Sequence, residues 1–117
     1  MRAVLLALFL PVAAQAQEAV NWGEGAVLRA LDKINAKVQD ITLTNGDSAE
    51  IGLISIELKE CRYPVGDPSG NAYAFLTIRE EGVSEPVFRG WMIAASPALN
   101  PLDHPRYDVW VLRCTTS

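Results

Sequence analysis

The sequence predicts an all-β protein, a small six- to seven-stranded barrel or orthogonal sandwich that follows an N-terminal signal peptide. Short runs rich in β-branched and aromatic residues recur along the chain, as is typical of half-buried strands. Clusters of Gly, Pro, Asn and Asp separate these runs and mark turns. The 117 residues suffice for one domain with one core.

The first 16 residues, MRAVLLALFLPVAAQA, have the pattern of a signal peptide. Arg2 precedes an apolar stretch, and Ala14-Gln15-Ala16 is a small-x-small cleavage site. A retained anchor is the weaker alternative, because the stretch is shorter than the roughly 20 residues that span a bilayer. We expect cleavage after Ala16, a periplasmic or otherwise exported protein, and no transmembrane anchor after cleavage.

The start of the mature chain is predicted to be a loose arm over residues 17–25, followed by a single β domain over residues 26–117. Residues 26–32 are ambiguous, because the apolar positions that begin at Val27 also fit an amphipathic helix. We favour a strand there and leave the helix open.

A bent hairpin is predicted between a strand over residues 34–43 and a second strand that ends near Leu58. Thr44-Asn45-Gly46 suits a three-residue hairpin loop, which would set Leu43 opposite Asp47. The apolar residues of both strands change from odd to even positions at the same level, beside Gly52. Such a change indicates a corner of a barrel or of an orthogonal sandwich.

The remaining strands are predicted over residues 73–79, 88–94 and 107–113. The first has two largely apolar faces and should be central. The last should present Trp110, Leu112 and Cys114 on one face. Cys61 is out of phase with the apolar residues before it, which indicates a bulge near Lys59-Glu60.

A proline-rich loop joins the last two strands. It contains Pro97, Pro101 and Pro105, which exclude regular helix and strand pairing. Leu99 and Leu102 should hold it against the surface.

Charge and cysteine content limit the function classes. The chain has a net charge of −4, and loss of residues 1–16 removes one basic residue, so nucleic acid is not expected as a partner. In an oxidising compartment the two cysteines, Cys61 and Cys114, permit one disulfide. Two separate buried thiols are the alternative.

No motif for catalysis, metal binding or cofactor binding is present, so we expect no metal and no cofactor. His104 beside Asp103 is the one candidate general base, but neither Ser84 nor Ser96 lies in a nucleophile motif. A structural histidine that binds backbone groups is the favoured interpretation. The adjacent Glu80-Glu81 pair is better explained by solvated strand-end charges than by glycoside hydrolysis.

The three tryptophans are candidates for a carbohydrate or peptide platform, namely Trp22, Trp91 and Trp110, although a tryptophan within an apolar strand usually lies in the core. Trp91 shares its strand face with Arg89, which suggests a cation–π pair. The candidate binding residues are therefore Arg89, Trp91, Asp103, His104 and Tyr107.

The motifs LDKIN, GLISIELKEC, GWM, ASPALN, HP and YDVWV, with the terminal cysteine, resemble the secreted bacterial family known as domain of unknown function 2155. The resemblance covers nearly all of the mature chain. The family often has Thr-Gly where this chain has Asn35-Ala36, and an aromatic residue at the position of Ile51. It implies an envelope location and a compact domain, but no activity.

The sequence thus favours a non-catalytic binding or interaction module that acts through the loop over residues 95–107. Its partner would be an unknown envelope protein or a small ligand. Two alternatives remain: a small hydrolase that uses His104 and Asp103, and a structural assembly subunit that pairs through a sheet edge.

Overall fold

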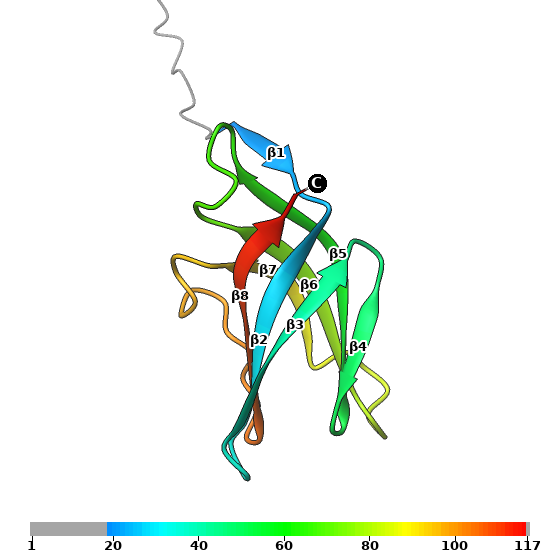
Figure 1. Ribbon diagram of the computed structural model, residues 1–117. Coiled ribbons are helices and arrows are strands. Elements are labelled where there is room, and N and C mark those ends of the chain that lie inside the picture. Colours follow the sequence, from blue (N-terminus) through cyan, green and yellow to red (C-terminus); the bar gives the residue numbers. More distant parts are fainter. Residues whose placement is uncertain (1–18, 117) are drawn as a thin grey trace, which may run out of the picture.

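The computed structural model describes residues 19–116, which form eight strands (Figure 1). In chain order they are β1 (Val20–Trp22), β2 (Gly25–Asp32), β3 (Lys37–Thr44), β4 (Ser48–Ile51), β5 (Ile54–Pro64), β6 (Tyr73–Glu80), β7 (Phe88–Ile93) and β8 (Tyr107–Thr115). No helix in this part of the chain is long and apolar enough to cross a membrane.

The strands form two antiparallel sheets. One has the order β1-β5-β6-β7, with β4 also paired to β5, and the other has the order β3-β2-β8. β4 pairs with the first half of β5 and β1 with its last residues. Within residues 19–116 the sheets do not close into a barrel, so the all-β prediction is confirmed, while of its two forms, barrel or sandwich, the barrel is wrong.

The core lies between the sheets, which Figure 1 shows packed face to face. Alternate residues of β6 contribute Ala74, Leu76 and Ile78, while β8 contributes Val109 and Val111, all with at most 1% of their surface exposed. The predicted disulfide is present: Cys61 in β5 is bonded to Cys114 in β8, with the two Cα atoms 5.6 Å apart. It therefore links the two sheets through the core.

Residues 26–32 form a strand, so the helical alternative is wrong. The predicted pairing of β3 is also wrong, because β3 pairs with β2, with Asp32 opposite Lys37. The turn between them is tight: Ala36 has φ of 59°, the Asp32 carboxylate accepts a hydrogen bond from Ile34 N, and Asn35 Oδ1 accepts one from Lys37 N. Residues 34–36 thus form a turn where a strand was expected.

The predicted long strand ending at Leu58 is divided in two. Gly52, with φ of 55°, and Leu53 form a two-residue turn, and β4 and β5 pair with each other across it. This turn accounts for the change of apolar positions beside Gly52, because the chain reverses there instead of bending. The division, together with β1, raises the strand number from the expected six or seven to eight.

The predicted face of β8 is corrected by a bulge. Val27 and Leu28 of β2 pair with Arg113 and Val111, so Leu112 is the extra residue. Before the bulge, Val109 and Val111 point into the core and Trp110 points away from it. After the bulge, Cys114 points into the core. Trp110 and Cys114 therefore do not share a face.

Other predictions are confirmed. The register of β5 shifts between Leu58 and Glu60, as the phase of Cys61 indicated, and β6 is central between β5 and β7. The expected loose arm is corrected from Val20 onward, where β1 pairs with the end of β5. The predicted signal peptide lies outside the described residues.

Candidate functional site

The outer face of the five-stranded sheet carries four aromatic side chains. Because Ala74, Leu76 and Ile78 of β6 point into the core, Tyr73 and Phe75 point away from it. Strand pairing aligns their neighbours: Trp22 is opposite Arg62, Arg62 is opposite Tyr73, and Phe75 is opposite Trp91. We call the set Trp22, Lys59, Arg62, Tyr73, Phe75 and Trp91 the aromatic face.

Arg62 lies at the centre of this face. Its guanidinium carbon is 5.4 Å from the ring centroid of Trp22 and 5.1 Å from that of Trp91, so the cation lies close to both indoles. Trp91 also meets Phe75 edge-on, with the ring centroids 5.4 Å apart. Glu60 forms an ion pair with the Arg62 guanidinium. These contacts hold the planar groups in one arrangement.

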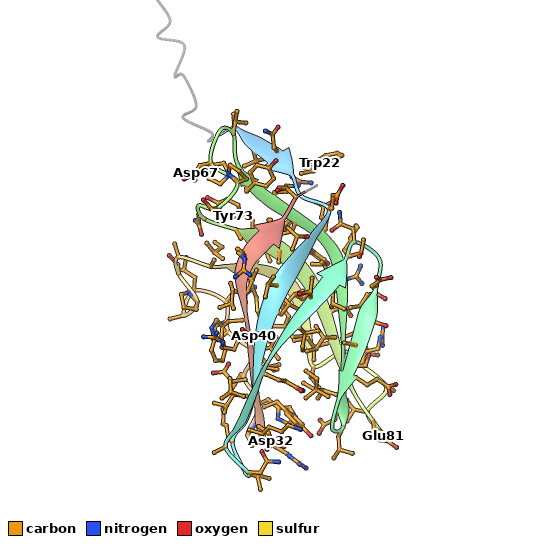
Figure 2. All side chains as sticks on the ribbon, in the orientation of Figure 1. Trp22, Asp32, Asp40, Asp67, Tyr73 and Glu81 are labelled. Atoms are coloured by element: carbon orange, nitrogen blue, oxygen red, sulfur yellow. A yellow bond between two sulfur atoms is a disulfide. The ribbon has the colours of Figure 1, made fainter. Side chains whose placement is uncertain are left out.

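A hollow of about 340 Å³ adjoins this stack, lined by Val20, Arg62, Tyr73 and Trp91. Trp22 is 70% exposed, and Figure 2 shows it at the same end of the molecule as Tyr73 and opposite Asp32. The Nε atom of Arg62 is buried and has no hydrogen-bond partner among the described residues. The face thus combines the exposed indole of Trp22 with the partly exposed ion pair of Arg62 and Glu60.

His104 lies at the inner side of the same sheet, near its opposite end. Its Nδ1 accepts hydrogen bonds from the backbone N–H groups of Arg106 (3.0 Å) and Tyr107 (3.2 Å). Since Nδ1 is an acceptor, the neutral ring carries its proton on Nε2, which lies 3.2 Å from a Glu80 carboxylate oxygen. Lys33 Nζ donates to the backbone oxygen of His104.

Both ring nitrogens of His104 therefore have partners, and only 8% of the residue is exposed. No hydroxyl group of the described residues is among those partners. A general base needs a free acceptor within reach of a nucleophile. The geometry is that of a histidine that shapes the loop before β8.

Tyr107 is 1% exposed, and its hydroxyl accepts a hydrogen bond from Leu53 N, 2.9 Å away. It thus connects the start of β8 to the turn between β4 and β5. Leu102 anchors the preceding loop with 4% exposure, whereas Leu99, the other expected anchor, is 72% exposed. The prediction that both leucines hold the loop against the surface is therefore confirmed for Leu102 and wrong for Leu99.

Asp32 and Arg106 form a second fixed point beside this loop. Arg106 donates to both carboxylate oxygens of Asp32, with the shortest contact at 3.0 Å. These hydrogen bonds hold the pKa of the Asp32 carboxyl below its usual value and raise that of the Arg106 guanidinium. The pair closes the end of the sandwich where β2 and β8 meet.

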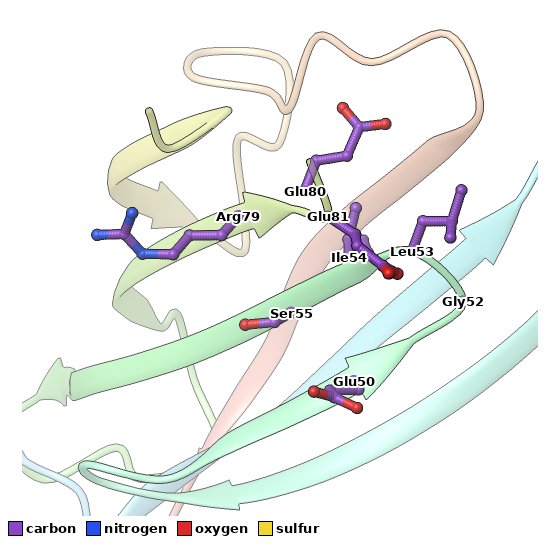
Figure 3. A pocket seen from close by; sticks show the side chains of 8 residues that line it. All are labelled: Glu50, Gly52, Leu53, Ile54, Ser55, Arg79, Glu80 and Glu81. Atoms are coloured by element: carbon purple, nitrogen blue, oxygen red, sulfur yellow. The ribbon is translucent and has the colours of Figure 1, made fainter. Parts of the chain in front are cut away.

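An acidic hollow of about 260 Å³ lies at the turn between β4 and β5, and its lining includes Glu50, Arg79, Glu80 and Glu81 (Figure 3). Figure 3 shows the side chains of Glu80 and Glu81 pointing in different directions. Glu80 is the partner of His104, so it is not a solvated strand-end charge as expected. In residues 19–116 no group of three or more His, Cys, Asp or Glu side chains has a metal-binding arrangement.

The structure separates the sequence-predicted binding residues into two groups. Arg89 and Trp91 lie on β7 with their side chains on the outer face, whereas His104 and Tyr107 are buried on the inner side and Asp103 is exposed in the loop beside them. The cation over Trp91 is Arg62 and not Arg89.

The sequence offered Trp22 only as one of three candidate platform tryptophans and did not identify Arg62. Trp22 stands in a short polar stretch that showed no periodicity, and the position of Arg62 depends on the register across the bulge at Lys59. The available signals for this face were the alternation of Tyr73 and Phe75 with core residues and the position of Trp91 in its strand.

Comparison with known proteins gives a match to one family model. The model of the family described as an uncharacterised protein conserved in bacteria (DUF2155) matches residues 26–114. An uncharacterised protein of Rickettsia prowazekii (strain Madrid E) is 31% identical over 97 residues, which cover 80% of this chain and 62% of the relative. The chain thus spans less than two thirds of that relative. No solved structure matches significantly.

Proposed function

The chain belongs to the uncharacterised bacterial family DUF2155, and we propose that it is an exported, non-catalytic binding module that binds its ligand on the aromatic face. The observation that carries this proposal is the placement of Arg62 between Trp22 and Trp91 beside an open hollow. Aromatic and arginine side chains dominate binding energies at recognition surfaces.

The exposure of the aromatic side chains supports a binding role. A tryptophan that is 70% exposed, as Trp22 is, leaves apolar area in water that a ligand would cover. Its indole is nevertheless held by the pairing of β1 with β5 and by Arg62, so little side-chain entropy would be lost on binding.

The state of His104 supports the absence of catalysis, because both its nitrogens serve the fold. Export is supported by the disulfide, which is typical of proteins in oxidising compartments, and by the signal-peptide pattern of residues 1–16. The alternatives are the hydrolase that uses His104 and Asp103 and the assembly subunit that pairs through a sheet edge.

The test uses the fluorescence of Trp22 and Trp91 in a Trp110→Phe background, so that signals come from the aromatic face. The purified protein is titrated with a size-fractionated, protein-free envelope extract. We expect a saturable change that Trp22→Ala abolishes and that Leu99→Ala, at an equally exposed loop position, does not.

A response that persists in Trp22→Ala but disappears in Leu99→Ala would move the binding surface to the loop over residues 95–107. Turnover of an ester or amide substrate that is lost in His104→Ala would replace the binding module with the hydrolase.

A further inference from the structure

The charged residues around the aromatic face alternate in sign. By strand alternation and register, the outer surface of this sheet carries four cations, Lys59, Arg62, Arg79 and Arg89, and three carboxylates, Glu50, Glu57 and Glu60. Each cation has a carboxylate in its own row of residues paired across the strands or in a neighbouring row. Arg62 forms an ion pair with Glu60, and Glu57 and Arg89 lie on either side of Thr77 of β6, which is paired with both. The surface is therefore close to electrically balanced.

This balance excludes ligands that are held by charge. A polyanion such as nucleic acid or an anionic lipid surface requires a clear excess of Lys and Arg on the contact face. Here the central cation, Arg62, is already neutralised by Glu60. Binding through this face should depend on stacking and on directional hydrogen bonds.

The position of the face within the sheet argues against an extended peptide. Peptides recognised by strand addition use the unpaired backbone groups of an edge strand. β6 is hydrogen-bonded on both sides, to β5 and to β7, so its outer surface offers side chains and no free backbone edge. The hollow is shallow and open, formed by Val20 of β1, Arg62, Tyr73 and Trp91.

An uncharged sugar has the matching chemistry. The C–H face of a pyranose ring is flat and apolar and stacks on an aromatic ring, while its hydroxyl groups both donate and accept hydrogen bonds. Trp22 offers an exposed ring, and the neighbouring Arg62–Glu60 pair offers a planar donor beside an acceptor. A sugar bound in the hollow would lie against the side chains of Arg62, Tyr73 and Trp91, which line it.

We propose that the ligand of the aromatic face is an uncharged glycan chain, with one sugar stacked on Trp22 and another seated in the hollow beside Arg62 and Trp91. This inference rests on the proposed function, because it names the ligand class of the same surface. The chain character follows from the extent of the face, which runs across β1, β5, β6 and β7.

The test is calorimetric and fluorescence titration of the Trp110→Phe protein with hexasaccharides. The probes are the hexamers of α-1,4-glucose, β-1,4-glucose and β-1,4-N-acetylglucosamine, together with hexagalacturonate, hexaglutamate, a DNA hexanucleotide and anionic phospholipid vesicles. At least one uncharged hexasaccharide should bind more tightly than its monosaccharide and than every charged probe. Its affinity should change less than twofold between about 0.05 and 0.5 M salt, because no counterions are released.

Variants separate stacking from a general loss of structure. Trp22→Ala should weaken hexasaccharide binding at least tenfold, and Trp22→Tyr, which keeps an aromatic ring, should restore part of it. Leu99→Ala should leave the affinity unchanged. Retained cooperative unfolding of Trp22→Ala confirms that its fold is intact.

Tighter binding of a charged probe, a steep salt dependence, or no binding of any uncharged hexasaccharide would overturn the glycan inference. The proposed function is tested separately, by the titration with the envelope extract. It is supported if the extract changes the fluorescence of the aromatic face even when no hexasaccharide binds, and it is wrong if the response to the extract does not depend on Trp22.

Discussion

Replacement of His104 tests how the loop before β8 is held. In His104→Ala the backbone N–H groups of Arg106 and Tyr107 lose their acceptor, and Glu80 loses its Nε2 donor. A hydrogen bond contributes about 1 kcal/mol net, and a buried donor left unpaired costs more, so the free energy of unfolding should fall by about 2–3 kcal/mol. The Tyr107 N–H is buried, which places most of the loss there.

His104→Asn is the matched control, because the asparagine Oδ1 lies at a position similar to that of the histidine Nδ1 and can accept the same two hydrogen bonds. It keeps the acceptor and loses only the contact with Glu80, so we expect a loss of about 1 kcal/mol or less. Urea unfolding monitored by tryptophan fluorescence, analysed with a common m-value, measures both variants.

Equal losses in His104→Ala and His104→Asn would refute the role of the acceptor nitrogen. A change below about 0.5 kcal/mol in His104→Ala, the usual size of a surface substitution, would show that the ring does not hold the loop.

Three further predictions concern the fold. Replacing Cys61 and Cys114 by serine should lower the free energy of unfolding by about 4 kcal/mol, the chain-entropy value for a loop of 53 residues, and an unchanged urea midpoint would contradict this. Ala36→Gly should raise the free energy of unfolding by about 0.5–1 kcal/mol, because relief of the strain of the left-handed φ of 59° exceeds the cost of the entropy that glycine adds to the unfolded chain. A lower free energy of unfolding in the same urea assay would refute the strain. Arg106 lowers the pKa of the Asp32 carboxyl from its ordinary value of 3.8, so the carboxylate stabilises the fold above that pH and this contribution is lost as the pH falls through the lowered pKa. The difference in free energy of unfolding between wild type and Asp32→Asn should therefore be constant near neutrality and vanish in acid. A difference that persists at the lowest pH would contradict this.

Alternation along single strands was the reliable signal in the sequence. It located β6, β7 and β8, and the phase of Cys61 located the bulge before it, because both depend on which residues one strand buries. The disulfide followed from the number of cysteines and the expected compartment.

Pairing between strands was less predictable. The turn at Thr44-Asn45-Gly46 does form, with Asp47 N bonded to Thr44 O, but β3 and β4 then enter different sheets. Turn chemistry is local, whereas the choice of β2 as the partner of β3 depends on contacts across the whole domain. The left-handed φ of Ala36 agrees with the glycine that the family often has at this position, which marks the turn that strand periodicity concealed.

The aromatic face could be predicted only in part, for the same reason. Trp91 was identified from its strand, but its partners Trp22 and Arg62 come from β1 and β5, and they meet only because of the register of both strands. A three-residue strand such as β1 has too few positions to show a period.

The most direct test of the central claim is an NMR titration of ¹⁵N-labelled protein with the protein-free envelope extract. We expect the amide and indole signals that shift to belong to Trp22, Arg62, Tyr73, Phe75 and Trp91. Shifts confined to residues 95–107 or to the neighbourhood of His104 would contradict it, and would favour the loop or the hydrolase respectively.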